Sequence, residues 1–206
     1  MNLTILGATG ATGRELVRQA IDRGHTVTAI ARRPDTLDIP DSGRLIRVAA
    51  DVLDSDAIGA SLTGSKIVLS GLGNVSGQDP RVLSAGARAV VAADPERIIW
   101  LGAFGTGSSA SAAGPLTRTL LGLVLRVELG DKVAADGAVL AAGGTVFHAG
   151  PLTNGALSET RRALDLDAVP RRIFPGRISR ATVAAVMLDE AEGPAHHATT
   201  LVPLDR

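Results

Sequence analysis

The chain has no cysteine and no tyrosine among its 206 residues, and aromatic residues make up only 2% of it. The absence of cysteine excludes disulfides, thiolate nucleophiles and cysteine metal ligands. The four histidines include the adjacent pair His196 and His197, whose spacing fits no metal motif, so we expect no bound metal. The absence of tyrosine excludes every mechanism in which a phenol donates the proton.

An excess of one charge and long apolar runs are also lacking. The 21 basic and 21 acidic residues give a formal net charge of zero, which argues against a nucleic-acid-binding or membrane-binding surface. No run of about 18 apolar residues could form a transmembrane helix. Residues 1–6 carry no basic leader, so the expected compartment is the cytoplasm.

Short apolar runs alternate with longer helical segments along the chain. Strands are expected at residues 3–6, 27–31, 45–48, 66–70, 97–101, 145–148 and 199–202. Helices are expected at residues 12–23, 54–61, 80–93, 115–142 and 180–191. Strands that are apolar on both faces and separated by helices indicate a parallel sheet covered by helices on both sides. The expected fold is therefore α/β, a Rossmann-type doubly wound parallel sheet in a single domain.

The second half of the chain is less regular than the first. Small residues fill 105–114, which we expect to be a loop, and 170–176 contain two prolines and are expected to cross the surface. The helix expected at 115–142 has a predicted break near Gly130. Its apolar part at 116–127 forms a substrate wall, a dimer surface or part of the core.

A glycine-rich turn, Gly-Ala-Thr-Gly-Ala-Thr-Gly at residues 7–13, follows the first expected strand. Glycines let the backbone approach a diphosphate closely, and a helix that begins there offers free N–H groups and a positive dipole end. Thr9 and Thr12 add hydroxyl donors, and Gly13 permits close packing of helix on sheet. The alternative is a plain tight turn, but the position inside a βαβ pattern favours dinucleotide binding.

The second expected strand ends in Arg32 and Arg33, where NAD-specific domains usually carry a carboxylate. Two guanidinium groups suit the 2′-phosphate of NADP, so we expect NADP(H) to be preferred over NAD(H); the alternative is a pair of solvated arginines. Asp51 either accepts a hydrogen bond from adenine, with Val52 packed on the ring, or shapes the loop. Asp54 is expected to cap the next helix.

These motifs, together with later segments, resemble the atypical short-chain dehydrogenase/reductases, in particular the NAD(P)H-binding group that holds biliverdin reductase B (flavin reductase) and the NmrA-like proteins. The resemblance rests on residues 7–13, 32–33, 51–52, 71–73, 98–104, 131–136, 143–153 and 178–184. It implies one NAD(P)-binding Rossmann domain over residues 1–206 with small C-terminal elements of a substrate cleft. The cofactor-binding residues expected from the turn, the strand ends and the resemblance are Gly7, Thr9, Gly10, Ala11, Thr12, Gly13, Arg32, Arg33, Asp51, Val52, Gly71, Leu72, Gly73, Gly102, Ala103, Phe104, Lys132, Pro151 and Leu152.

Three departures from this family bear on the chemistry. The family's tyrosine proton donor is absent, Gly102 stands where related proteins carry serine or threonine, and His148 replaces a usual arginine. Lys132 matches the family's lysine that contacts the nicotinamide ribose, or is a solvated helix residue. His148 is a proton donor or a buried histidine satisfied by backbone hydrogen bonds. The catalytic residues are therefore open, with Lys132 and His148 as candidates.

Two functions remain. The first is a reductase that passes a hydride from NADPH to a flat acceptor such as a flavin, a quinone or a tetrapyrrole-like molecule, because such acceptors need little help from side chains. The second is an NmrA-like dinucleotide-binding regulator or redox sensor that performs no turnover. Both imply a small-molecule ligand, without direct contact to nucleic acid or membrane, and both leave open whether the chain is a monomer or a homodimer.

Overall fold

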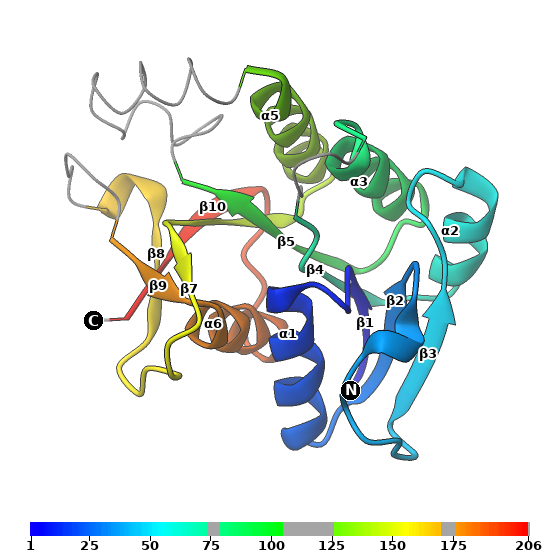
Figure 1. Cartoon of the computed structure of the whole chain (residues 1–206). Coiled ribbons are helices and arrows are strands. Elements are labelled where there is room, and N and C mark those ends of the chain that lie inside the picture. The colour runs from blue at the N-terminus through cyan, green and yellow to red at the C-terminus, as the bar shows by residue number, and fades with distance from the viewer. Residues whose placement is uncertain (74–78, 105–125, 170–175, 206) are drawn as a thin grey trace.

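The computed structural model describes residues 1–73, 79–104, 126–169 and 176–205, which form one α/β unit around a central sheet (Figure 1). The strands of this sheet lie in the order β3-β2-β1-β4-β5-β6-β10-β8. All neighbouring strands are parallel except β8, which runs antiparallel to β10. The strands are β1 (Asn2–Leu6), β2 (Thr26–Ala31), β3 (Leu45–Ala49), β4 (Ile67–Ser70), β5 (Arg97–Ala103), β6 (Thr145–Ala149), β8 (Arg162–Asp165) and β10 (Thr199–Leu204). A separate parallel pair joins β7 (Leu152–Thr153) to β9 (Ile178–Ser179).

Helices cover both faces of the sheet, as the apolar strands require. Figure 1 shows α1 and α6 side by side on one face and α2, α3 and α5 on the other. The helices are α1 (Ala11–Asp22), α2 (Ser55–Leu62), α3 (Val82–Ala92), α5 (Arg126–Ala141) and α6 (Arg180–Glu192), with 3₁₀ turns at η1 (Pro34–Thr36) and η3 (Leu166–Ala168). Among the helices that the structure describes, none has the length and apolar character needed to cross a membrane.

Each face of the sheet has its own apolar core, because side chains alternate along a strand. Leu3 and Ile5 pack toward α1 and α6, whereas Leu6 belongs to the core beneath α2, α3 and α5. The expected inward residues of α1, which are Leu16, Val17 and Ala20, are all fully buried. Each buried leucine or valine stabilises the fold by roughly 1.5–3 kcal/mol.

The expected doubly wound sheet is confirmed, and all seven expected strands are present with ends within two residues of the prediction. The break predicted near Gly130 is wrong, because α5 runs through this position without interruption. Glycine costs a helix about 1 kcal/mol, and the burial of Ala135 and Val139 against α3 outweighs that cost. The loop at 105–114, the helix start at 115–125 and the segment 170–175 lie outside the described residues.

Besides the apolar packing, a buried carboxylate of α5 forms hydrogen bonds with α3. Asp131 is buried, and its two oxygens accept hydrogen bonds from the backbone N–H groups of Leu83 and Ser84, at 2.9 and 3.0 Å. These N–H groups lie in the first turn of α3, where no intrahelical partner exists. Asp131 therefore caps α3 from the neighbouring helix and fixes the position of α5 over the sheet.

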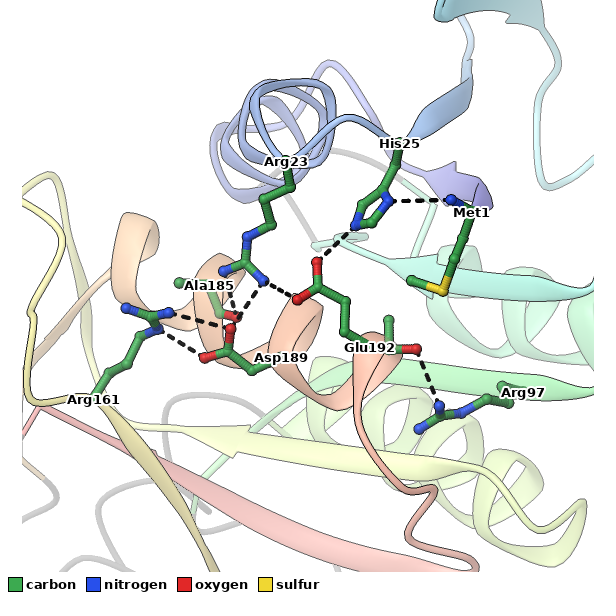
Figure 2. Close-up of polar contacts among 9 residues, drawn as sticks. Met1, Arg23, His25, Arg97, Arg161, Ala185, Asp189 and Glu192 are labelled. Atoms are coloured by element: carbon green, nitrogen blue, oxygen red, sulfur yellow. Dashed lines mark hydrogen bonds and ion pairs between the residues drawn. The ribbon is translucent and has the colours of Figure 1, made fainter.

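Charged side chains hold α6 in place at the end of the sheet where the parallel strands begin. Figure 2 shows Asp189 of α6 between Arg161 and Arg23, the residue after α1, at 2.8 and 2.9 Å, while Glu192 contacts Arg23 at 3.0 Å and His25 at 2.7 Å. His25 is buried and the other side chains are partly exposed, and their contacts link the end of α1 to the end of α6.

Glu190, which follows Asp189 in α6, is buried at the same end of the sheet. Its Oε1 accepts hydrogen bonds from the Arg97 guanidinium, the Thr145 hydroxyl and the His196 backbone N–H, at 3.3, 3.3 and 3.0 Å. Its Oε2 lies 2.7 Å from His196 Nδ1. Glu190 therefore ties α6 to the starts of β5 and β6.

Candidate functional site

The glycine-rich turn brings the start of α1 against the ends of β1 and β4. Gly7 has a positive φ of 74°, which favours glycine. A side chain at Gly13 is excluded because its Cβ would lie 2.1 Å from the Gly7 carbonyl oxygen. A Cβ at Gly71 would lie 3.0 Å from the backbone of Gly13. The expectation that Gly13 permits close packing of helix on sheet is confirmed.

The first turn of α1 is an open anion-binding position. Gly10 is the N-cap residue, no side chain in the described part of the chain caps this end, and the turn contains no acidic residue. The N–H groups at a helix start lack intrahelical partners and carry the positive end of the helix dipole. A phosphate beside Gly10 would satisfy both the hydrogen bonds and the charge.

Two cavities meet at this turn. The first has a volume of about 240 Å³ and the second about 360 Å³, and both are bordered by Gly10, Gly71, Leu72 and Gly73. Together they form one trough across the carboxyl ends of β1 and β4. The strand order reverses between β1 and β4, and ligands of open α/β sheets bind at this point.

The first cavity lies toward the end of β2. The expected site residues along it are Gly7, Thr9, Gly10, Arg32, Asp51, Val52, Gly71, Leu72 and Gly73. Asp51 accepts a hydrogen bond from the Leu53 backbone N–H at 3.0 Å, so it does shape the loop. Its side chain also borders the cavity. Asp54 caps α2 by accepting from the N–H groups of Asp56 and Ala57, as expected.

The second cavity lies toward the ends of β5 and α5. The expected site residues along it are Gly10, Ala11, Thr12, Gly71, Leu72, Gly73, Gly102, Ala103, Lys132 and Leu152. The residues that sequence reasoning missed are Leu83, Leu101, Asp136 and Arg180. Lys132 is half-buried and, among the described residues, makes no ion pair.

Four expected site residues border neither cavity. Gly13 lies behind the turn, and Pro151 is exposed. Arg33 is exposed, and its carbonyl oxygen accepts hydrogen bonds from Thr36. Phe104 borders a third cavity instead. The trough therefore brings together Arg32 and the glycine-rich segments, but not Arg33.

His148 also lies outside the trough, because it is completely buried in β6. Its Nε2 lies 3.0 Å from Oδ2 of Asp136, whose own side chain is 5% exposed. His148 is therefore the buried histidine of the second alternative, and its partners include a carboxylate. The sequence signal for Asp136 was its spacing of four residues from Lys132, which puts both residues on one face of α5.

Comparison with known proteins identifies the family. The sequence profile of a family described as NAD(P)H-binding matches residues 7–194. The chain belongs to this NAD(P)H-binding family. The NAD(P)H-binding group expected from the sequence is therefore confirmed, and solved structures share the Rossmann fold.

Solved structures of other proteins share this fold. ChuY, an anaerobillin reductase from Escherichia coli O157:H7, is 16% identical with a TM-score of 0.77, and the alignment covers 100% of this chain and 97% of ChuY. A short-chain dehydrogenase/reductase from Veillonella parvula in complex with NADP is 15% identical with a TM-score of 0.79, over 98% and 93% of the two chains.

A third of the chain also matches a short part of a larger protein. An uncharacterized protein of Mycobacterium tuberculosis is 39% identical over 69 residues, which are 33% of this chain. This match spans only 8% of the length of the mycobacterial protein.

Proposed function

We propose that this chain is a reductase that transfers a hydride from NADPH to a flat small-molecule acceptor, such as a flavin, a quinone or a tetrapyrrole-like molecule. The observation that carries this proposal is the trough. An uncapped helix start lies at its middle, Arg32 lies at one end, and Lys132 and Asp136 lie at the other. This order of charges suits an NADPH molecule laid across β1 and β4.

The proposed orientation follows from the charges. The diphosphate lies at Gly10, where the first N–H groups of α1 neutralise it. The adenosine half occupies the first cavity, between Val52 and Arg32. The Arg32 guanidinium then binds the 2′-phosphate, with Arg33 as a second cation at the same edge. The preference for NADP(H) over NAD(H) is part of the proposal.

The nicotinamide half then occupies the second cavity. Lys132 contacts the ribose there, and the small residues Gly102 and Ala103 at the end of β5 leave room for the ring. Positioning of the ring against an acceptor supplies much of the rate enhancement, while the cofactor carries the redox chemistry. The overall reaction consumes NADPH, one proton and the acceptor, and yields NADP⁺ and the reduced acceptor.

In this proposal the acceptor reaches from the nicotinamide end of the trough into the third cavity, of about 640 Å³, where Phe104 and Ile178 lie next to Ala103 and Leu152 of the trough. Its lining is mainly apolar and comes from Phe104 together with β8, β9 and β10. Arg162 and Arg177 border it and are exposed. An apolar cavity with two cations suits a flat molecule that carries acidic groups. In this view the C-terminal elements form a small substrate cleft on the Rossmann domain of residues 1–206.

An NmrA-like regulator would use the same trough without turnover. The carboxyl group of Asp136 favours the reductase, because it borders the nicotinamide end of the trough at the energetic expense of burial. Binding of a dinucleotide alone does not require an acidic group at that position, where the cofactor is itself anionic.

Calorimetry with NADPH and NADH, followed by the loss of NADPH absorbance in the presence of flavin mononucleotide, a quinone or a linear tetrapyrrole, tests the proposal. We expect tighter binding of NADPH and turnover with at least one acceptor. The variant Asp189→Asn, at the far edge of the sheet, is the matched control and should bind NADPH like the wild type. Binding without oxidation by any acceptor would support the regulator, and no binding of either nucleotide would refute both functions.

A further inference from the structure

The buried pair of Asp136 and His148 is asymmetric. The imidazole is completely enclosed, whereas the carboxyl group keeps one opening, which faces the second cavity. A pair that only joined α5 to β6 could be enclosed on both sides. The carboxyl group of Asp136 is thus held by His148 on one side, while the residue borders the second cavity on the other.

Gly102 makes room for this arrangement. A Cβ at this position would lie 2.8 Å from His148 Cδ2 and 2.9 and 3.0 Å from the two oxygens of Asp136. Gly102 and His148 are register partners in the parallel strands β5 and β6. The space where the side chain of residue 102 would lie is therefore filled by the carboxyl group and the imidazole, and the end of β5 presents their acid to the cavity.

The position of α5 also places the carboxyl group of Asp136. Asp131 anchors the helix to α3 through the hydrogen bonds to Leu83 and Ser84. Lys132, the next residue, and Asp136, one turn beyond Lys132, both border the cavity. The helix therefore presents a cation and an acid side by side.

Few other groups at this cavity could supply a proton. Among the described residues along it, the side chains with exchangeable protons are Thr12, Lys132, Asp136 and Arg180. Arginine does not deprotonate in proteins, and a threonine hydroxyl is a very weak acid. Thr12 also lies in the first turn of α1, beside the proposed diphosphate. Lys132 and Asp136 remain, since Asp205 borders only the third cavity, and only the Asp136 side chain is held in one orientation by an imidazole.

We infer that Asp136 is the residue that protonates the acceptor, and that His148 is a positioning residue that holds its carboxyl group through the contact between Nε2 and Oδ2. This inference rests on the proposed reductase function. Bound NADPH would supply the hydride that bonds to the acceptor, and a proton on the Asp136 carboxyl group passes to the acceptor's heteroatom. The resulting carboxylate accepts the Nε2–H of His148 until solvent returns a proton to it.

Two acceptors distinguish proton donation by Asp136 from a role in hydride transfer or cofactor binding. A quinone takes up a hydride and a proton, whereas N-methylacridinium, a flat cation, takes up a hydride alone. In Asp136→Asn, which keeps the shape of the side chain, we expect kcat for the quinone to fall by about 100-fold or more. We expect kcat for N-methylacridinium and the Kd of NADPH to stay within about threefold of the wild type, because hydride transfer needs no acid.

The pH profile adds a second readout. The charged groups that border the same cavity are Lys132 and Arg180, and the group behind Asp136 is His148. A proton donor works only while it is protonated, so wild-type kcat with the quinone should fall on the alkaline side of its pH profile. This limb should be absent in Asp136→Asn and return in Asp136→Glu. Lys132→Met should change the rates with both acceptors alike.

If Asp136→Asn does not fold, His148→Leu provides a second test, because leucine cannot donate a hydrogen bond to the Asp136 carboxyl group. It should slow the quinone reaction selectively. Equal rates of quinone reduction in wild type and a folded Asp136→Asn would overturn the inference and leave the reductase function standing. Equal slowing with both acceptors would also overturn it and assign the pair a structural role. Wild type inactive with both acceptors would overturn the reductase proposal itself.

Discussion

The two ends of the strands in the central sheet differ in whether their charged side chains have partners. Where the strands begin, charged side chains face one another, and Glu190 and Asp189 of α6 are held by arginines and histidine. Where the strands end, glycines and an uncapped helix start dominate. In the described part of the chain, the Arg32 and Lys132 side chains at that edge have no ionic partner.

Because of this difference, the charged residues that stabilise the fold and those available to bind a ligand lie at different ends of the strands. Polar groups that satisfy one another stabilise the fold, and a ligand gains nothing by approaching them. Polar groups that lack partners are costly unless solvent or a ligand binds them. The carboxyl edge is therefore the edge at which a ligand gains most, and substitutions at the two edges should have separable effects on binding and on unfolding.

The largest effect on binding is expected from Gly13→Ala. The new methyl group would lie 2.1 Å from the Gly7 carbonyl oxygen, so the turn must move and the N–H groups of α1 leave the phosphate position. We expect NADPH affinity to fall by about 100-fold or more by calorimetry, equivalent to about 2.7 kcal/mol. The control is Gly59→Ala in α2, where a Cβ meets nothing within 4 Å. Unchanged affinity in Gly13→Ala would contradict the proposed diphosphate position.

The next effect is expected at the opposite edge, from Glu190→Gln. This change removes the charge that faces Arg97 and one acceptor of His196, while keeping the size of the side chain. Because Glu190 is buried, we expect the free energy of unfolding to fall by about 2–3 kcal/mol in urea titrations. NADPH affinity should not change. Asp189→Asn, next to it but exposed, should cost less than about 1 kcal/mol; equal costs would argue against the role of burial.

The smallest effect is expected from Arg32→Ala and Arg33→Ala. Loss of a guanidinium from the 2′-phosphate should weaken NADPH binding by about tenfold, or about 1.4 kcal/mol, and leave NADH binding nearly unchanged. The effect should be larger for Arg32, which borders the first cavity, than for Arg33, which does not. Competition binding with both nucleotides measures this difference, and equal losses for NADPH and NADH would refute the NADP preference.

Local pattern predicted the first half of the fold because its strands are apolar on both faces and its turns contain glycine. The break at Gly130 was wrong because glycine's low helix propensity is a local property, whereas contacts with α3 hold α5 together. The two-residue strands β7 and β9 are too short for periodicity and exist only through pairing with each other.

The turn, the end of β2 and the end of β4 were predictable because each site residue there lies within a short motif. Asp136 was not predicted, because what makes it notable comes from other segments. Its partner His148 lies twelve residues further on, and the room for both comes from Gly102 on β5. A carboxylate between Ala135 and Gly137 on a helix has no sequence signature for burial until these contacts are known.

The bond from Asp131 to the start of α3 has a mechanical consequence. Val82 and Leu83, at that start, border the first and the second cavity, respectively, while the helix that carries Asp131 also carries Lys132 and Asp136. One wall of the trough and the carboxyl group of Asp136 are thus joined through a hydrogen-bonded contact between two helices. Under the proposed function we expect the two to move together when a nucleotide binds, so that the distance from the nicotinamide ring to the carboxyl group is preserved.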